Sequence, residues 1–552
     1  MPPSSPNASD ATSGFLSRIG RVLRPSHQHS ALSATLLLMA SVMLARVIGY
    51  LREMYVAWAF GAGPKTDAYV AAFQIPDYLF YLLAGGTTSI TFISIYARHT
   101  SRGEEERAQK AFDTTITVMS VIALIGTVIV EFFTPQIARL IFPDFTAEQM
   151  ALCVYLTRVL LPGQIFFYAG GIVSGVLLSR RMFLYPALSP VFYGMSIIVG
   201  GLLGAHRFGI AALAYGALAG SFLGPFLINS IGAAKTGLSY HWNFDIRNPE
   251  FREWVKLSIP LMLGVSLVSA DDWILRYFAS GGAGEISRLN YAKRLFALPI
   301  SILGQAAGQA SMPFFARLFG ERKRKEFADS VNGSVYRVGS AALLVTALMA
   351  TAALPLVDLA FHRGRFNFQD AQLTATYFAW FSLSLALWSA QGLYARAFYA
   401  TGNTLVPMVA STLIVIASLP VYSTMFHHFG FAGLAMASDL GILMHTIAIA
   451  WLLHSRRLVR LDELPSIEVA KALVTAVVAG LACYAVASRL PAGGWRRDLV
   501  ALVAIGATWL AAVAAGLWFT RSHLWQDLRR RRAPLEVESS AIVQRTEGGV
   551  QP

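Results

Sequence analysis

The stretch LARVIGYLRE, residues 44–53, lies inside an apolar run that extends over residues 31–60. Roughly 20 residues are enough for a helix to cross the ~30 Å hydrocarbon core of a bilayer, so this run can span a membrane. An arginine at the centre of such a helix costs roughly 2.5–3.5 kcal/mol on insertion scales. We therefore expect Arg46, Arg52 and Glu53 to face water, a counterion or a ligand, and not lipid.

The rest of the chain has the same apolar character. Of its 552 residues, 55% are hydrophobic and 14% are charged, whereas a soluble protein carries roughly 25% charged residues. The apolar runs are continuous rather than alternating, which favours helices over barrel strands. We predict an all-α polytopic membrane protein with about fourteen transmembrane helices. Their expected positions are 33–60, 66–96, 110–133, 148–179, 183–204, 209–232, 252–278, 286–316, 331–359, 371–400, 404–426, 430–454, 467–489 and 497–520.

Basic residues give the chain a net charge of +14, and they cluster in alternate loops between the expected helices. This positive-inside pattern predicts an even number of spans with both termini in the cytoplasm. The charge therefore orients the protein, and we expect no nucleic-acid partner. The clusters on the cytoplasmic side are Arg18, Arg21 and Arg24; Arg98, Arg102, Arg107 and Lys110; Arg180 and Arg181; Lys235, Arg247, Arg252 and Lys256; Arg317, Arg322, Lys323, Arg324 and Lys325; Arg456, Arg457 and Arg460; and Arg529 to Arg532.

Short sequence matches recur at an offset of about 220 residues. HRFGIAAL at 206–213 is similar to HHFGFAGL at 427–434, and PQIARLIF at 135–142 is similar to PLVDLAF at 355–361. The offset predicts two six-helix lobes in the same orientation, and parallel repeats of this kind in transporters place the substrate between the halves. The expected segments are a disordered basic cytoplasmic tail (1–30), an N-lobe (31–233), a cytoplasmic linker (234–250), a C-lobe (251–456), two additional helices (457–521) and a second cytoplasmic tail (522–552).

The charges of the first expected helix form a mixed surface. Arg46 and Glu53 are seven residues apart and share one face of a helix, whereas Arg52 points about a third of a turn away. Gly49 between them allows a neighbouring helix or a ligand to approach closely. Two interpretations stay open: the charges pair inside the helix bundle, or they bind a ligand.

The C-terminal half carries further intramembrane charges. In SADDWILRYF, Asp272 and Arg276 follow Asp271 and have the spacing of a self-satisfied helical ion pair. Arg294 has no obvious local acid and is the better candidate for a ligand-binding group. Asp439 fits a buried hydrogen-bonded role and an ion-coupling role equally well. Cations from both halves suit a phosphate or pyrophosphate, which guanidinium groups bind with two hydrogen bonds.

At these residues the sequence resembles the MurJ (MviN) family of lipid II flippases, within the multidrug/oligosaccharidyl-lipid/polysaccharide exporter superfamily. The resemblance rests on four blocks that are spread over the chain. They are ARVIGYLRE at 45–53, AFGAGPKTDAYVAAFQIP at 59–76, YAKRLFALP at 291–299 and FYATGNTLVP at 398–407.

The resemblance implies a transporter rather than an enzyme. A flippase of this family would carry a polyprenyl-diphosphate-linked glycan, most simply lipid II, to the outer leaflet of the bacterial cytoplasmic membrane by alternating access, for peptidoglycan synthesis. Arg46, Arg52 and Arg294 would bind the diphosphate, while Glu53 and Asp67 would hold the arginines or form part of a gate. The two additional helices would form a groove for the polyprenyl tail. Membrane lipids and cell-wall synthesis proteins are the implied partners. No cofactor or metal is implied, and a coupling cation or the membrane potential stays open.

The sequence departs from the family pattern at two positions in the second expected helix. Phe80 stands where the family usually has arginine, and Gly85, in AGGT, stands where it has glutamate. These departures leave open a flippase for another lipid-linked polysaccharide and a transport-inactive scaffold. A membrane glycosyltransferase or ligase is a further alternative. It would need a large outer loop with catalytic carboxylates or histidine, and every expected outer loop is short.

Overall fold

The structure, a computed structural model, describes residues 31–84, 88–262, 267–491 and 493–525. The two expected tails therefore fall largely outside the described residues, and Gly85 lies outside them as well. The chain divides into two compact units. Unit 1 comprises Met1–Tyr291 and Phe361–Asp370, and unit 2 comprises Ala292–Ala360 and Ala371–Pro552. The N-lobe and C-lobe expected from the repeat stay a prediction.

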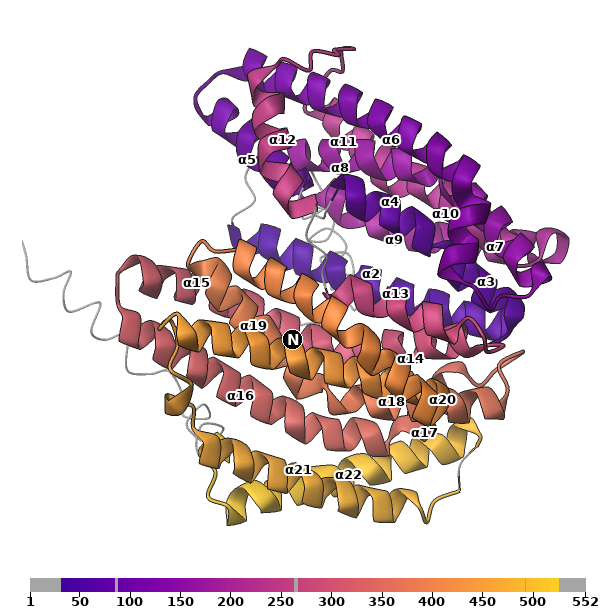
Figure 1. The fold of residues 1–552 in the computed structure, drawn as a ribbon, viewed down its shortest axis with the longest axis vertical. Helices are drawn as coiled ribbons and strands as arrows, with labels where there is room; N and C mark the ends of the chain where they lie inside the picture. Colours follow the sequence, from indigo (N-terminus) through magenta and orange to yellow (C-terminus); the bar gives the residue numbers. More distant parts are fainter. Residues whose placement is uncertain (1–30, 85–87, 263–266, 492, 526–552) are drawn as a thin grey trace, which may run out of the picture. The chain divides into compact units, whose positions relative to one another are not determined.

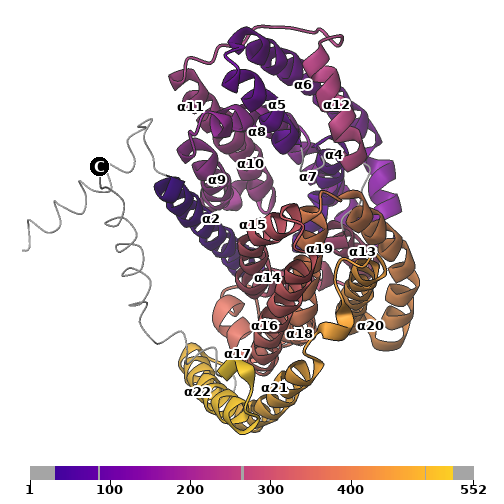
Figure 2. The same cartoon turned by 90° about the vertical axis from the view of Figure 1, so that its left-hand side faces the viewer.

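In the described residues of unit 1, all regular secondary structure is helical (Figures 1 and 2). Its helices are α2 (Ala31–Phe60), α3 (Pro64–Ala72), α4 (Gln74–Ala84), α5 (Thr88–Ser101), α6 (Glu105–Ile141), α7 (Ala147–Leu160), α8 (Gly163–Ser179), α9 (Leu184–Phe208), α10 (Ala211–Ser221), the π-helix η1 (Phe222–Ile228), α11 (Asn229–Lys235), α12 (Pro249–Met262), α13 (Leu267–Ala279) and the first half of α14 (Glu285–Pro299).

Unit 2 is built in the same way. Its helices are the second half of α14, the π-helix η2 (Ile300–Ala306), α15 (Ala307–Gly320), α16 (Arg324–Thr351), α17 (Ala353–Phe361), α18 (Phe368–Leu383), α19 (Leu385–Ala400), α20 (Leu405–Ser455), the short 3-10 helix η3 (Leu461–Glu463), α21 (Ser466–Ala487) and α22 (Trp495–Phe519). Phe361, at the end of α17, and the first residues of α18 belong to unit 1.

Helices occupy every predicted range within the described residues. The all-α membrane fold is therefore confirmed, whereas the number of fourteen spans stays a prediction. Eight described stretches are long and apolar enough to cross a membrane: Glu105–Ile141, Ala147–Ser179, Leu184–Phe208, Ala211–Lys235, Arg324–Thr351, Leu405–Ser455, Ser466–Ala487 and Trp495–Phe519. The 51 residues of Leu405–Ser455 bend at Gly430, whose φ of 59° is left-handed, and this bend separates the two helices predicted there.

Glycines of α9 fix the orientation of α2 within unit 1. A Cβ atom on Gly194 would lie 2.8 Å from Cγ2 of Ile48, and one on Gly201 would lie 2.5 Å from the ring of Tyr55. Ile48 and Tyr55 are seven residues apart, so one face of α2 packs closely on α9. The face that carries Arg46 and Glu53 is consequently turned away from α9.

Each unit has its own apolar core. In unit 1, aromatic and aliphatic side chains of α5, α6, α8 and α12 pack together, and Figure 2 shows α5 and α8 side by side. In unit 2, α21 and α22 pack beside α16 (Figure 1). The indole Nε1 of Trp509 donates to the Leu344 carbonyl at 2.7 Å, which ties α22 to α16. A Cβ on Gly516 would approach Thr475 to 2.5 Å, so α22 needs a glycine there to pack on α21.

Candidate functional site

The predicted charges of α2 form an ion pair with a partner from α14. Nη2 of Arg52 lies 2.8 Å from Oε1 of Glu53, and Nδ2 of Asn290 donates to Oε2 of Glu53 at 3.3 Å. The Glu53 residue is 7% exposed. Its carboxylate is therefore compensated on both oxygens. The contact to Glu53 uses one of the five N–H donors of Arg52.

Arg46 and Gly49 lie on the same side of α2 as Glu53, and both are half-buried. Within the described part of unit 1, no atom outside Gly49's immediate neighbours and the backbone of α2 itself comes within 4 Å of the position that a Cβ on Gly49 would occupy. Gly49 is therefore not a contact point for another helix of unit 1. This geometry favours the ligand interpretation of Gly49. We refer to Arg46, Gly49, Arg52 and Glu53 as the ionic face of α2.

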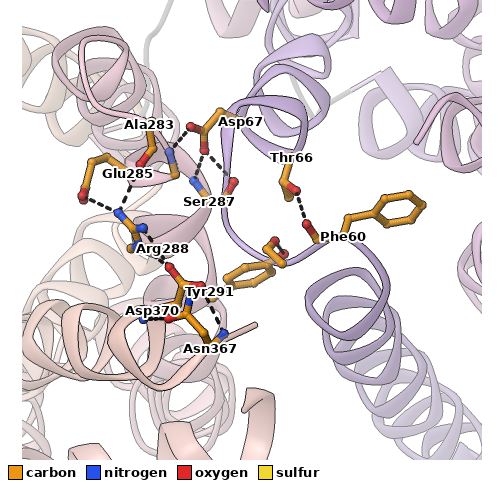
Figure 3. A network of polar contacts seen from close by, with 12 residues as sticks. Phe60, Thr66, Asp67, Ala283, Glu285, Ser287, Arg288, Tyr291, Asn367 and Asp370 are labelled. Carbon is orange, nitrogen blue, oxygen red and sulfur yellow. Dashed lines mark hydrogen bonds and ion pairs between the residues drawn. The ribbon is translucent and has the colours of Figure 1, made fainter. Parts of the chain in front are cut away.

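Asp67, in the first turn of α3, is fully buried and caps the N-terminus of α14 (Figure 3). Its Oδ1 accepts hydrogen bonds from the Ser287 N–H at 2.8 Å and the Ser287 hydroxyl at 2.6 Å, and its Oδ2 accepts one from the Gly284 N–H. The first N–H groups of a helix have no partner within the helix, and a carboxylate there also interacts favourably with the helix dipole. Asp67 thus holds α3 against the start of α14.

A second buried acid meets the same turn of α14. Nε and Nη2 of Arg288 donate to Oδ1 of Asp370 at 3.0 and 2.8 Å, and its Nη1 donates to Glu285 at 2.6 Å. Asp370 is itself held by Asn367, because each backbone N–H donates to the other residue's side chain. Figure 3 shows this chain of contacts continuing from Asp67. We refer to Asp67, Glu285, Ser287, Arg288 and Asp370 as the cap cluster.

The end of α2 is joined to the cap cluster through backbone contacts. The Tyr291 hydroxyl donates to the Gly61 carbonyl at 3.2 Å, and the Arg365 N–H donates to the Trp58 carbonyl at 3.0 Å. Gly61 and Gly364 have φ values of +72° and +64°, and a Cβ on either would lie within 2.6 Å of a backbone oxygen. Both positions therefore require glycine.

The other predicted residues lie elsewhere in the fold. Asp271, Asp272 and Arg276 all lie in α13, where Asp271 is buried. The expected pairing of Asp272 with Arg276 stays a prediction. Arg294, which is exposed, and Asp439, which is half-buried, belong to unit 2.

Phe80 lies in an aromatic cluster of unit 1. Its ring is 5.6 Å from that of Tyr168 and 6.2 Å from that of Phe167. The Tyr168 hydroxyl donates to the carbonyls of Leu79 and Phe80, which fixes the ring beside α4. Phe80 also lines a cavity of about 240 Å³ together with Asp77 and residues of α8 and α9. An aromatic side chain is therefore integrated into the packing at the position where the resemblance led us to expect a cation.

Sequence reasoning missed five residues of the two sites: Glu285, Ser287, Arg288, Asn290 and Asp370. One signal was available, because Glu285 and Arg288 are three residues apart and so share a helix face. The pairing of Arg288 with Asp370, 82 residues later, had no local signal.

Comparisons with known proteins agree with this architecture. The family model described as "Lipid II flippase MurJ" matches residues 56–505. A Rhizobium tropici protein named "Probable lipid II flippase MurJ" is 25% identical over 421 residues, which cover 75% of this chain and 79% of that protein. The solved structure "Lipid II flippase MurJ, inward closed conformation" matches with a TM-score of 0.73 at 20% identity, over 87% of this chain and 99% of that one.

A more distant structural match concerns the fold alone. An inward-facing multidrug resistance MATE family transporter of the MOP superfamily has a TM-score of 0.61 at 15% identity, over 76% of this chain and 98% of that one. The family match, in contrast, extends over most of the sequence and includes Asp67, the cap cluster and Arg294. The chain therefore belongs to the MurJ family of lipid II flippases, which are transporters and not enzymes.

Proposed function

We propose that this chain carries lipid II from the cytoplasmic to the outer leaflet of the bacterial cytoplasmic membrane by alternating access. The observation that supports the proposal best is the ionic face of α2, which lies on an apolar helix and whose residues Arg46 and Glu53 are turned away from α9. Charges placed in this way inside a membrane protein mark a substrate pathway. The matched range of the family model begins at residue 56, so the roles of the α2 residues rest on their chemistry and on the resemblance of ARVIGYLRE at 45–53.

Arg46, Arg52 and Arg294 bind the diphosphate in this proposal. The Arg52–Glu53 pair orients the guanidinium and offsets its charge when no substrate is present. Four N–H donors of Arg52 are not used by this pair, so a phosphate can bind while the pair stays intact. Asp271, Asp272, Arg276 and Asp439 have structural or ion-coupling roles, and either a cation or the membrane potential supplies the driving force.

The cap cluster closes the outer side in this proposal. Three loops contribute to it or flank it, at residues 61–63, 280–284 and 362–367. With both termini in the cytoplasm and fourteen spans, all three loops lie on the outer side of the membrane. Opening to that side has to remove the Asp67 cap and separate Arg288 from Asp370, so the closed state is favoured until substrate binding compensates.

The polyprenyl tail binds at α21 and α22 in this proposal. Unit 2 has a groove of about 630 Å³ beside these helices, and it is mainly apolar. Its lining includes Leu354, Pro355, Ala379, Tyr484, Ala501 and Ile505. An isoprenoid chain can lie in this groove while the charged head group crosses, which gives the two helices outside the six-helix lobes a function.

Complementation tests the proposal. A bacterial host is depleted of its resident flippase and expresses the parent chain, Arg46→Ala or Arg294→Ala at equal membrane levels. Arg102→Ala is the matched control, because Arg102 is an exposed arginine in the turn after α5. We expect the parent and the control to rescue growth and the other two variants to fail. Rescue by all four chains would contradict the diphosphate-binding roles and leave the transport function standing.

A flippase for a different polyprenyl-diphosphate glycan is the second candidate, and the packing of Phe80 favours it. Transport of lipid II by the purified parent in proteoliposomes distinguishes the two candidates. If the parent is inactive on lipid II but folded, Phe80→Arg tests whether the missing cation sets the substrate. Gain of lipid II transport in this variant would support the second candidate.

A further inference from the structure

The chain between α11 and α12 runs along the first turns of α6 (Figure 2). We call residues 239–247 the strap. Gln109 donates to the Ser239 carbonyl at 2.6 Å, and the N–H groups of His241 and Asn243 donate to Asp113 and Thr117 at 3.1 and 3.5 Å. Two residues of extended chain advance about 6.6 Å, and four residues of α-helix advance about 6 Å. The strap therefore stays in register with one face of α6.

The strap covers a polar stripe of α6. Asp113, Thr114 and Thr117 are all buried, and Nδ2 of Asn243 donates to the Thr114 hydroxyl at 3.0 Å. The strap donates hydrogen bonds to this stripe, so the stripe does not face hydrocarbon. The length of α6 agrees, because its 37 residues extend about 55 Å, well beyond a ~30 Å hydrocarbon core. The strap consequently lies at the level where α6 enters the membrane.

The opposite face of the strap is apolar. Trp242, Phe244 and Ile246 are 71%, 51% and 56% exposed. Trp242 and Phe244 occupy alternate positions of the extended part of the strap, so their side chains point to one side, and Ile246 follows in the turn at its end. Asp245, between them, points to the other side and accepts a hydrogen bond from the Arg247 N–H at 3.0 Å. Exposed aromatic residues at the water boundary of a membrane protein bind the headgroup region of lipids.

Exposed cations flank this apolar row. They are Lys235, Arg247, Arg252 and Lys256. The neighbouring acids are already paired, since Glu253 binds Arg98 at 2.9 Å and Glu250 lies 3.4 Å from Arg107. Asp245 is the remaining acid of the row, so the four cations leave a net positive charge there, and this charge complements an anionic phospholipid surface.

We propose that the strap is a lipid-binding surface: Trp242, Phe244 and Ile246 insert among the phospholipid head groups at the membrane boundary of α6, and Arg247 and Arg252 bind anionic head groups. The ligand is the bulk anionic phospholipid of that leaflet. This surface goes beyond the proposed function, because it needs only that the chain spans a membrane and does not involve the transported lipid.

Depth-dependent fluorescence quenching tests the proposal. The full chain has two cysteines, Cys153 and Cys483, and both are buried. A thiol-reactive fluorophore therefore reports from Trp242→Cys or Phe244→Cys, with the unsubstituted chain as the labelling blank. Asp245→Cys is the matched control, because it lies in the same segment on the opposite face. The proteins are reconstituted in nanodiscs of phosphatidylcholine with or without phosphatidylglycerol, and without lipid II.

We expect lipids that carry a nitroxide near the head group to quench the labels at 242 and 244 roughly threefold more strongly than the label at 245, because interfacial side chains sit at that depth. Iodide in the buffer should show the reverse order. Phosphatidylglycerol should increase the lipid quenching, and the double substitution Arg247→Gln with Arg252→Gln should remove this increase.

Equal lipid quenching at 242, 244 and 245, or quenching at 242 by iodide alone, would overturn the proposal. Phosphatidylglycerol dependence that persists without the two arginines would overturn their assigned role. Size-exclusion chromatography of each variant checks that the protein is folded before it is measured. Because no transport takes place in the assay, failure of the proposed flippase function leaves this test unaffected.

Discussion

The ionic face of α2 and the cap cluster both place charges in an apolar chain, but they compensate these charges differently. In the cap cluster, Asp67 accepts three hydrogen bonds and Arg288 donates to two carboxylates, all within buried turns. On α2, Arg52 is held by a single neighbouring acid, and the space beside Gly49 is not filled by unit 1. Fully bonded charges stabilise one conformation, whereas a cation with unused donors is suited to a ligand. Substitutions in the two regions should therefore separate stability from transport.

The largest effect on stability is expected for Arg288→Ala. This change leaves Glu285 and Asp370 buried without their cation, and breaking a buried ion pair from one side costs about 3–5 kcal/mol. Thermal unfolding of the purified protein in detergent should show a marked loss. Arg317→Ala, at an exposed arginine beside Glu321, is the control and should leave the melting temperature nearly unchanged. Equal melting temperatures for the two variants would contradict the stabilising role of the cap cluster.

The next effect is on transport and concerns Arg52→Ala. Loss of a charge-assisted hydrogen bond to the diphosphate should reduce lipid II transport in proteoliposomes roughly 10- to 100-fold at limiting substrate. The melting temperature should fall less than in Arg288→Ala, because Arg288 serves two buried carboxylates whereas Arg52 serves only Glu53, which keeps the contact with Asn290. Arg52→Lys keeps the positive charge but not the planar guanidinium with its paired N–H donors. It should therefore be more active than Arg52→Ala and less active than the parent. A large loss of stability without a specific loss of transport would show that Arg52 stabilises the fold and does not bind the substrate.

A smaller effect is expected when Asp67 is replaced in two ways. Asp67→Asn keeps one acceptor oxygen for the N-terminus of α14, whereas Asp67→Ala leaves buried N–H groups without a partner and costs about 1–3 kcal/mol. The alanine variant should unfold at the lower temperature. Amide hydrogen exchange at Gly284 and Ser287 should also be faster in it. Identical exchange in both variants would show that the Asp67 cap does not hold the first turn of α14.

The smallest change in stability should follow Gly49→Ala, and the comparison is with Gly61→Ala. The Gly49 position is helical and open within unit 1, so alanine should be neutral or stabilise by up to about 1 kcal/mol. Gly61 has a positive φ and a backbone oxygen 2.6 Å from the Cβ position, so alanine there should destabilise. Lower transport in the stable Gly49→Ala variant would support close approach of the substrate. Unchanged transport would remove Gly49 from the binding surface.

The sequence predicted the positions of the helices well, because apolar runs separated by charged loops report directly on where the chain enters and leaves a membrane. It did not predict the divisions inside those runs. The range 66–96 contains α3, α4 and α5, and the break at Phe73 is followed directly by Gln74, with Pro76 in the first turn of α4. A proline inside such a run indicates a bend, but it does not tell at which residue one helix ends and the next begins.

The site was predictable to a different extent in its two regions. The charges of α2 stand out because an arginine inside an apolar run is costly, and their local spacing defines a face. Asp67 was assigned only through the family resemblance, and its partners Gly284 and Ser287 are distant in the chain. Arg288 and Asp370 were missed because contacts between loops depend on how helices fold back, which a single sequence does not encode locally.

The cap on α14 also constrains the order in which the membrane protein is made. Asp67 precedes Gly284 by 217 residues, which a ribosome synthesises in roughly 10 to 40 s at ~5–20 residues per second. During that interval the Asp67 carboxylate has been synthesised, but the N–H groups of Gly284 and Ser287, which donate hydrogen bonds to it, have not. It has to remain hydrated, because burying an uncompensated carboxylate is prohibitively costly. The start of α3 therefore cannot complete its packing until α14 has been inserted.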